Sequence, residues 1–199
     1  MSKISIKGAD TGTGVFTLES PATNTDRTLT LPDEAGTVLT TATPGVPVNG
    51  PAFSSWVSSS NQTISHATFT KIALSVEGID TNSNYDTSTY RFTPTVAGYY
   101  QINASISFLF AATGTWEYFG VFAKNGDTDY QRFGNQYQEA FASNPSARQI
   151  DGSTLLYFNG TTDYLELYAY QSSGSNASVI GTTATGKYTR ISAFLARSA

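Results

Sequence analysis

Polar and apolar residues alternate strictly along residues 102–108 of this 199-residue chain. The apolar positions are Ile102, Ala104, Ile106 and Phe108, and the polar positions between them are Asn103, Ser105 and Ser107. A period of two is expected of a β-strand with one buried face, because successive side chains point to opposite faces. The pattern therefore predicts a core strand that continues to Phe110.

A turn precedes this strand, within the sequence Thr-Pro-Thr-Val-Ala-Gly of residues 93–98. Pro94 cannot donate to a strand ladder and Gly98 tolerates backbone angles that other residues resist. The chain is therefore predicted to reverse between Phe92 and Tyr99, and a hairpin is the natural interpretation. Four aromatic residues gather around the predicted turn: Tyr90, Phe92, Tyr99 and Tyr100.

These residues resemble the signature of the globular heads of complement-type and collagen-associated proteins, whose relatives include the tumour necrosis factor cytokines. Further blocks resemble the family in the same order: Asn-Tyr-Asp at 84–86, a strand ending in Lys-Asn-Gly at 121–126, a penultimate hairpin at 153–167 and a closing strand at 188–195. The resemblance implies an all-β, two-sheet jelly-roll sandwich that forms a trimer around a threefold axis. Strand register decides which aromatic residues line that axis, and the candidates are Tyr99, Tyr100, Phe108, Tyr168 and Tyr170.

Composition agrees with a soluble all-β protein. Aromatic residues make up 13% of the chain, Thr and Ser are abundant, and no run of 18 apolar residues occurs. The net charge is -4, and the 11 Lys and Arg residues are scattered. A nucleic-acid binder would carry a basic face, so nucleic acid is not expected as a partner. Because no run of 18 apolar residues occurs, membrane insertion is not expected either.

The chain contains no cysteine, and its start, MSKISIKGADTGTG, has no apolar segment of the kind that directs secretion. Small extracellular β domains usually rely on disulfides. Folding in a reducing cytoplasm is therefore expected.

The chain is predicted to divide at Pro44, into an N-terminal β-rich arm (1–43), a Pro/Gly linker (44–51) and the head (52–199). The arm holds short alternating runs that bury too few apolar residues to stand alone. These runs need a partner surface. The residues expected to make this attachment are Val15, Phe16, Leu18, Leu29, Leu31, Val38 and Leu39.

The arm carries a second resemblance. Its elements are a Gly-Val-Phe-Thr-Leu strand at 14–18, Pro-Ala-Thr at 21–23, Arg-Thr-Leu-Thr-Leu-Pro-Asp at 27–33 and Gly-Thr-Val-Leu at 36–39. Together they resemble a segment of bacteriophage tail fibres and related virion surface proteins. Joined to a complement-type head, the segment implies a phage structural protein, assembled in the host cytoplasm and located on the virion surface.

Catalysis finds little support in the sequence. His66, the single histidine, lies beside strand-like residues, so a structural or solvent role is expected. No Cys nucleophile, Gly-x-Ser-x-Gly elbow or phosphate-binding loop is present. The chain is therefore expected to be no enzyme and to need no cofactor or resident metal.

One segment, residues 80–86, places oxygen-bearing side chains at alternate positions, as a calcium loop does. Position six is Tyr85 instead of Gly, and position twelve is Arg91 instead of Glu. An Asx turn is the better interpretation. Some relatives of the complement head bind calcium, so the resemblance leaves a different oxygen cage open.

Aromatic residues recur at helix-like spacing in residues 130–141, although Gly134 and the neighbouring strands oppose a helix. Such rings can close an edge of the core or pack at a subunit interface, and exposed rings can stack on sugars. The first interpretation is favoured. The segment still supplies the candidate recognition surface: Tyr130, Phe133, Tyr137 and Phe141.

Three functions follow. The first is a trimeric capsid decoration (cement) protein whose arms bind the major capsid protein and whose knob aids host recognition. The second is a short tail fibre or fibre tip, attached to tail proteins, that binds host surface glycans. The third is a cytokine-like or pattern-recognition ligand. The sequence lacks heptads, collagen repeats and shaft modules, which favours decoration over a reaching fibre.

Overall fold

The computed structural model describes residues 50–111, 116–138, 146–183 and 186–199, with a few isolated positions between residues 11 and 28. The chain divides into two units, Met1–Val38 and Leu39–Ala199, and the strands of the described residues all belong to the second unit. The attachment residues expected in the arm lie outside the described residues.

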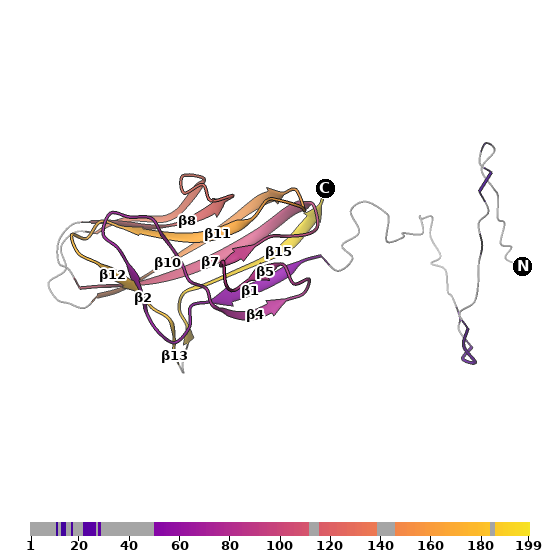
Figure 1. The fold of residues 1–199 in the computed structure, drawn as a ribbon, viewed down its shortest axis with the longest axis horizontal. Coiled ribbons are helices and arrows are strands. Elements are labelled where there is room, and N and C mark those ends of the chain that lie inside the picture. Colours follow the sequence, from indigo (N-terminus) through magenta and orange to yellow (C-terminus); the bar gives the residue numbers. More distant parts are fainter. Residues whose placement is uncertain are drawn as a thin grey trace, which may run out of the picture. The chain divides into compact units, whose positions relative to one another are not determined.

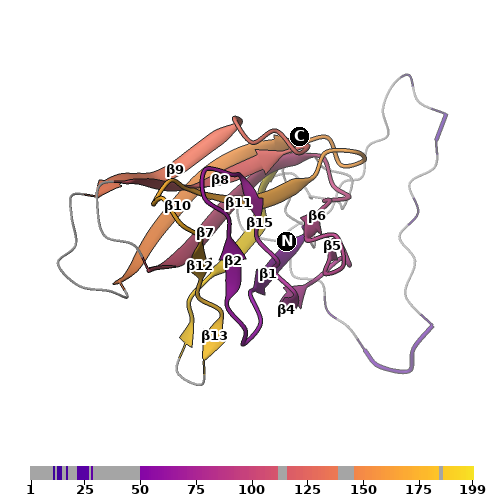
Figure 2. The same cartoon turned by 60° about the vertical axis from the view of Figure 1, so that its left-hand side comes forward.

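The described part of the head is built from strands alone, and two antiparallel sheets face each other across one core (Figure 1). Sheet A has seven strands: β1 (Ala52–Trp56), β2 (Gln62–Ile64), β4 (Val76–Asp80), β7 (Gly98–Phe110), β10 (Ser146–Phe158), β12 (Ala177–Val179) and β15 (Arg190–Ser198). Sheet B has six: β3 (Thr70–Lys71), β5 (Tyr85–Asp86), β6 (Arg91–Phe92), β8 (Trp116–Lys124), β9 (Gln131–Gln138) and β11 (Leu165–Gln171). Strands β13 (Thr182–Thr183) and β14 (Gly186–Lys187) form a small separate sheet that projects from the sandwich (Figure 2).

The chain passes repeatedly between the sheets, which gives the jelly-roll topology and confirms the predicted fold class. Strand β6 lies in sheet B and β7 in sheet A, and β10 lies in sheet A and β11 in sheet B. The predicted hairpins at 92–99 and 153–167 are therefore wrong, because each reversal carries the chain from one sheet to the other. Sequence alternation identifies strands, but it does not say which strands pair.

Strand β7 is the centre of sheet A. It pairs with β10 from Gly98 to Phe110, while β15 and β12 pair with its other edge. Its even-numbered residues from Tyr100 to Phe110 are buried, as the alternation predicts. The core strand expected from the sequence is thus confirmed, and its interior face lies against sheet B.

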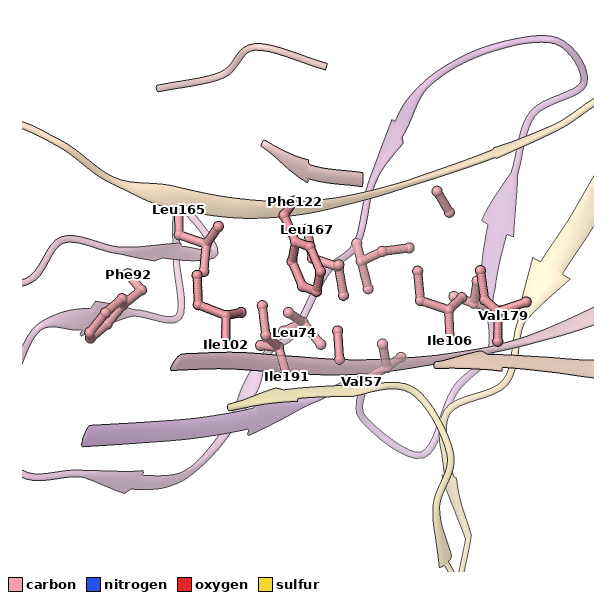
Figure 3. Close-up of a cluster of buried hydrophobic side chains, with 14 of the residues drawn as sticks. Val57, Leu74, Phe92, Ile102, Ile106, Phe122, Leu165, Leu167, Val179 and Ile191 are labelled. Carbon is pink, nitrogen blue, oxygen red and sulfur yellow. The ribbon is translucent and has the colours of Figure 1, made fainter. Parts of the chain in front are cut away.

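Aliphatic and aromatic side chains from both sheets fill the space between them (Figure 3). Ile102, Ile106 and Ile191 reach inward from sheet A, and Phe122 and Leu167 reach inward from sheet B. Phe92 and Tyr100 meet edge to face, with ring centroids 5.7 Å apart. Rings of this size supply much of the buried apolar area of a small domain.

At one edge of the core, Phe133 of β9 stacks on Phe122, with centroids 4.5 Å apart. A Cβ atom at Gly152 would overlap the Phe133 side chain, close to where that side chain leaves the backbone. Glycine at 152 therefore admits the ring between the edges of the two sheets.

We predict that Gly152→Ala lowers the free energy of unfolding by about 1–3 kcal/mol, because the new methyl group must displace Phe133. Gly186→Ala is a matched control, since its Cβ would meet nothing closer than 3.4 Å. Denaturant unfolding of both variants measures the difference. Equal stability of the two variants would show that the ring shifts without cost.

Candidate functional site

The outward side of sheet A presents a broad surface, which we call the outer face of sheet A. On β7 it begins with Tyr99, Gln101 and Asn103. In the register of the sheet, β10 places Tyr157, Leu155 and Ser153 opposite these residues. On the other edge, β15 places Arg197, Phe194 and Ser192 opposite the same three positions. Directly opposed residues share a face of the sheet.

Large hydrophobic side chains are concentrated on this face. Six large hydrophobic residues are exposed in the described part of the chain: Ile79 (56%), Leu155 (54%), Phe194 (49%), Tyr99 (45%), Tyr130 (44%) and Tyr157 (40%). All except Tyr130 lie on the outer face of sheet A, where Ile79 of β4 stands opposite Ser54 of β1. Single exposed apolar residues are ordinary, but a concentration on one face indicates an interaction surface.

A polar hollow of about 320 Å³ lies beside these apolar residues. Its polar lining comes from three adjacent strands: Asn103, Ser105, Asp151, Ser153, Arg190 and Ser192. Ser105 of β7 lines the middle of the hollow. Asp151 of β10 and Arg190 of β15 lie on the two sides of Ser105. The outer face therefore combines an apolar part with a polar depression.

The structure separates the five residues expected at a trimer axis. Tyr99 alone among them is exposed on the outer face of sheet A. Tyr100 and Phe108 are fully buried between the sheets, because they occupy the inward positions of β7. Their expected place at an axis is corrected to the core.

Tyr168 and Tyr170 lie on the outward side of sheet B. They pack against Phe119 and Val121, in a small cluster distinct from the core between the sheets. Tyr170 stacks on Phe119 at a centroid distance of 4.9 Å. The five axis candidates therefore fall on three different surfaces of the sandwich.

The candidate recognition segment forms strand β9, preceded by a turn, instead of a helix. Phe133 closes an edge of the core, which was the favoured interpretation of these rings. Tyr130 is exposed at the turn before β9. The side chain of Tyr137 and the whole of Phe141 lie outside the described residues.

Sequence reasoning missed Leu155, Tyr157 and Phe194. A usable signal exists at residues 155–158, Leu-Leu-Tyr-Phe, where both phases of the strand are apolar. Two apolar phases are typical of a strand covered on both faces. Leu156 and Phe158 are buried in the core, so Leu155 and Tyr157 are apolar residues left exposed on the opposite face of the strand.

On the outward side of sheet B, Glu166 is a buried carboxylate held by cations. Its Oε1 accepts hydrogen bonds from Arg91 Nε at 2.7 Å and Lys71 Nζ at 2.9 Å, and its Oε2 accepts one from the Tyr168 hydroxyl at 3.2 Å. Burial acts to raise the pKa of the Glu166 carboxyl, but the bonds from Arg91 and Lys71 outweigh burial and hold the pKa below its usual value. The network ties β3, β6 and β11 together.

The side chains of Asp80, Asp86 and His66 make hydrogen bonds within the head. The Asp80 carboxylate accepts hydrogen bonds from the backbone N–H groups of Asn82, Asn84 and Tyr85, as an Asx turn does. Hydrogen bonds from Ser88 and Thr89 lower the pKa of Asp86 to about 2. His66 Nδ1 accepts a bond from the Gly174 N–H at 3.0 Å. Side chains that could hold a metal ion do not cluster within the described ranges.

No helix that could span a membrane is found among the residues that the structure describes.

The sandwich belongs to the class of two-sheet jelly-roll domains. A scan against protein-family models and a search of curated proteins both found no match. Among solved structures, the chain is similar to the globular domain of zebrafish complement 1qA protein, with 14% identity, a TM-score of 0.47, and coverage of 75% of this chain and 99% of that one. It is also similar to Eiger TNF from S. frugiperda, with 14% identity, a TM-score of 0.47, and coverage of 79% and 96%. Neither similarity identifies a ligand or a partner of this chain.

We predict that Glu166→Gln lowers the free energy of unfolding by about 1–3 kcal/mol at neutral pH, because two cations lose their buried acceptor charge. The folded-state pKa of Glu166 is depressed, so its stabilisation is complete above the unfolded pKa and is lost as pH falls through the folded pKa. The difference in the free energy of unfolding between Glu166→Gln and the unaltered chain should therefore shrink as the pH falls below 4.5, the usual pKa of a glutamate carboxyl.

Urea unfolding at pH 7 and at successively lower pH measures this difference. Asp129→Asn is the control, because its ion pair with Arg132 is exposed and should contribute under about 1 kcal/mol. A Glu166 effect that stays constant down to the lowest pH would contradict the assigned role of the charge.

Proposed function

We propose that the chain is a non-enzymatic, homotrimeric structural protein of a bacteriophage virion, and that it acts as a capsid decoration protein. The single observation that carries the oligomeric part is the concentration of exposed apolar side chains on the outer face of sheet A. Covering such a face removes apolar surface from water, which is the main favourable term in protein association. The resemblance of the head sequence to complement-type domains supports three copies.

The virion assignment rests on the arm. Residues 12–41 resemble the surface segment of phage fibres, and the apolar runs there need a partner surface. In this proposal, Val15, Phe16, Leu18 and the other apolar residues of the arm bind the major capsid protein. The head then stands on the shell and stabilises it without carrying out chemistry.

A short tail fibre or fibre tip is the second candidate. Tyr130 favours it, because this ring is 44% exposed at the turn before β9 and does not lie on the outer face of sheet A. Exposed aromatic rings can stack on sugar faces, so the turn before β9 is the candidate glycan contact. A cytokine-like ligand ranks third, since the arm has no place in that function.

We predict that Leu155→Asp converts the trimer into monomers at micromolar concentration. Leu155 is 54% exposed in the protomer, so the change spares the core. Losing a buried leucine and burying a charge should weaken association by more than about tenfold. Native mass spectrometry or light scattering reports the assembly, and Tyr130→Asp is the control that should stay trimeric. An unaltered chain that is itself monomeric would refute the trimer.

We predict that particles assembled without this protein release DNA at lower temperature than complete particles. A protein that binds the assembled shell, but not its free subunits, stabilises the shell in proportion to occupancy. Adding back the full chain should restore stability, whereas a chain lacking residues 1–43 should remain folded and fail to restore it. Normal particle stability together with failed adsorption to host cells would instead favour the tail fibre.

A further inference from the structure

Three residues form one row across the centre of the outer face of sheet A. Ser105 of β7 stands opposite Asp151 of β10 on one side and Arg190 of β15 on the other. Neighbouring strands lie about 4.8 Å apart, so the backbones of Asp151 and Arg190 are separated by about 10 Å. All three residues line the polar hollow. The hollow thus has an acidic side, a basic side and a serine between them.

Asp151 and Arg190 make hydrogen bonds, but no ion pairs, within the described part of the protomer. The Asp151 carboxylate accepts hydrogen bonds from the Gln149 amide at 3.3 and 3.4 Å. Arg190 donates from Nη1 to the Lys187 carbonyl at 2.8 Å. Neither Asp151 nor Arg190 takes part in an ion pair among the described residues. Both retain hydrogen-bonding capacity for a group from outside.

Ser105 points to such a group more directly. The residue is only 2% exposed, and among the described residues its Oγ is the buried side-chain polar atom without a hydrogen-bond partner. Leaving a buried hydroxyl unpaired costs about 1–3 kcal/mol. A ligand or protein group that enters the hollow could supply the missing partner.

We propose that a second copy of this chain completes the hollow: Arg190 of each protomer pairs with Asp151 of the next, and the paired groups supply a partner for Ser105. This inference rests on the proposed homotrimer. In a cyclic assembly, one part of the face meets a different part of the next copy. Each copy carries both Asp151 and Arg190 on this face. Every interface of the ring can therefore bring Arg190 of one copy against Asp151 of the next.

The apolar residues beside the hollow assist this pairing. Leu155 and Phe194 stand in the row formed with Gln101, close to the row of Ser153, Asn103 and Ser192 that lines the hollow. When they are covered they exclude water, which strengthens a neighbouring ion pair. Desolvation offsets much of the gain from a buried ion pair, so the pair mainly fixes how the copies are rotated.

Charge reversal tests the pairing in the full chain. Asp151→Arg and Arg190→Asp each place like charges at every interface, and each should weaken trimer association by at least about tenfold. The double variant restores opposite charges and should assemble again. Native mass spectrometry over a concentration series measures association, and circular dichroism checks the fold.

Mixing distinguishes a pair between copies from one within a copy. An equimolar mixture of the two single variants forms opposite-charge pairs at two of three interfaces in a mixed ring. We expect mixed trimers at concentrations where each variant alone is dissociated. Single variants that assemble like the unaltered chain, or a mixture that stays as dissociated as its components, would overturn the proposal.

Asp129→Arg is the matched control, since it makes the same change at a carboxylate whose side chain is 77% exposed and which lies outside the hollow. It should leave the trimer intact. If a reversal unfolds the chain, Asp151→Asn and Arg190→Gln replace it, and each should also weaken association. A monomeric unaltered chain refutes the homotrimer itself, whereas a trimer insensitive to all these changes refutes only the ion pair.

Discussion

The pairing of β7 with strands on both of its edges is the constraint on which the rest of the structure depends. Strand β10 pairs with the whole length of β7, and β12 and β15 pair with its other edge. The alternation of inward and outward residues in β7 therefore fixes which residues of these three strands face the core. Even-numbered positions of β7 build the core, and odd-numbered positions build the outer face. A shift of one residue would exchange these two surfaces and expose the core. One register therefore determines both the stability of the sandwich and the chemistry of its candidate interface.

The sequence predicted what depends on local pattern. The core strand follows from alternation, and composition agrees with the all-β class. The strand ending in Lys-Asn-Gly at 121–126 and the closing strand at 188–195 come from the resemblance to complement-type heads. The structure has strands at these places, with β8 ending at Lys124 and β15 spanning Arg190–Ser198. The two predicted hairpins, at 92–99 and 153–167, depend on which strands pair, and both predictions were wrong. Phe92 and Tyr99 are separated by a few residues, yet they lie on strands of different sheets. Loop residues specify that the chain turns, but long-range packing specifies where it goes next.

The candidate site shows the same division. Tyr100 and Phe108 were expected at an axis because they are aromatic, but aromatic side chains serve cores and interfaces alike. Only the register of β7 against β10 and β15 places them in the core and Tyr99 on the surface. Asp151, Ser105 and Arg190 lie far apart in the sequence, and no local pattern relates them. Their row exists only after three strands have paired.

In the proposed capsid role, the division of the outer face of sheet A into apolar and polar parts would affect how the head binds a shell. Apolar contact supplies affinity without direction, whereas a charged pair across a hollow permits few rotations of one copy against another. In the proposed trimer, a head with one fixed geometry would present its three arms at fixed starting points. Linked attachments raise the local concentration of the second and third arm once the first has bound. In the proposed capsid role, three weak arms would together hold the head on a repeating shell, which would link the proposed pairing of Asp151 with Arg190 to attachment through residues 1–43.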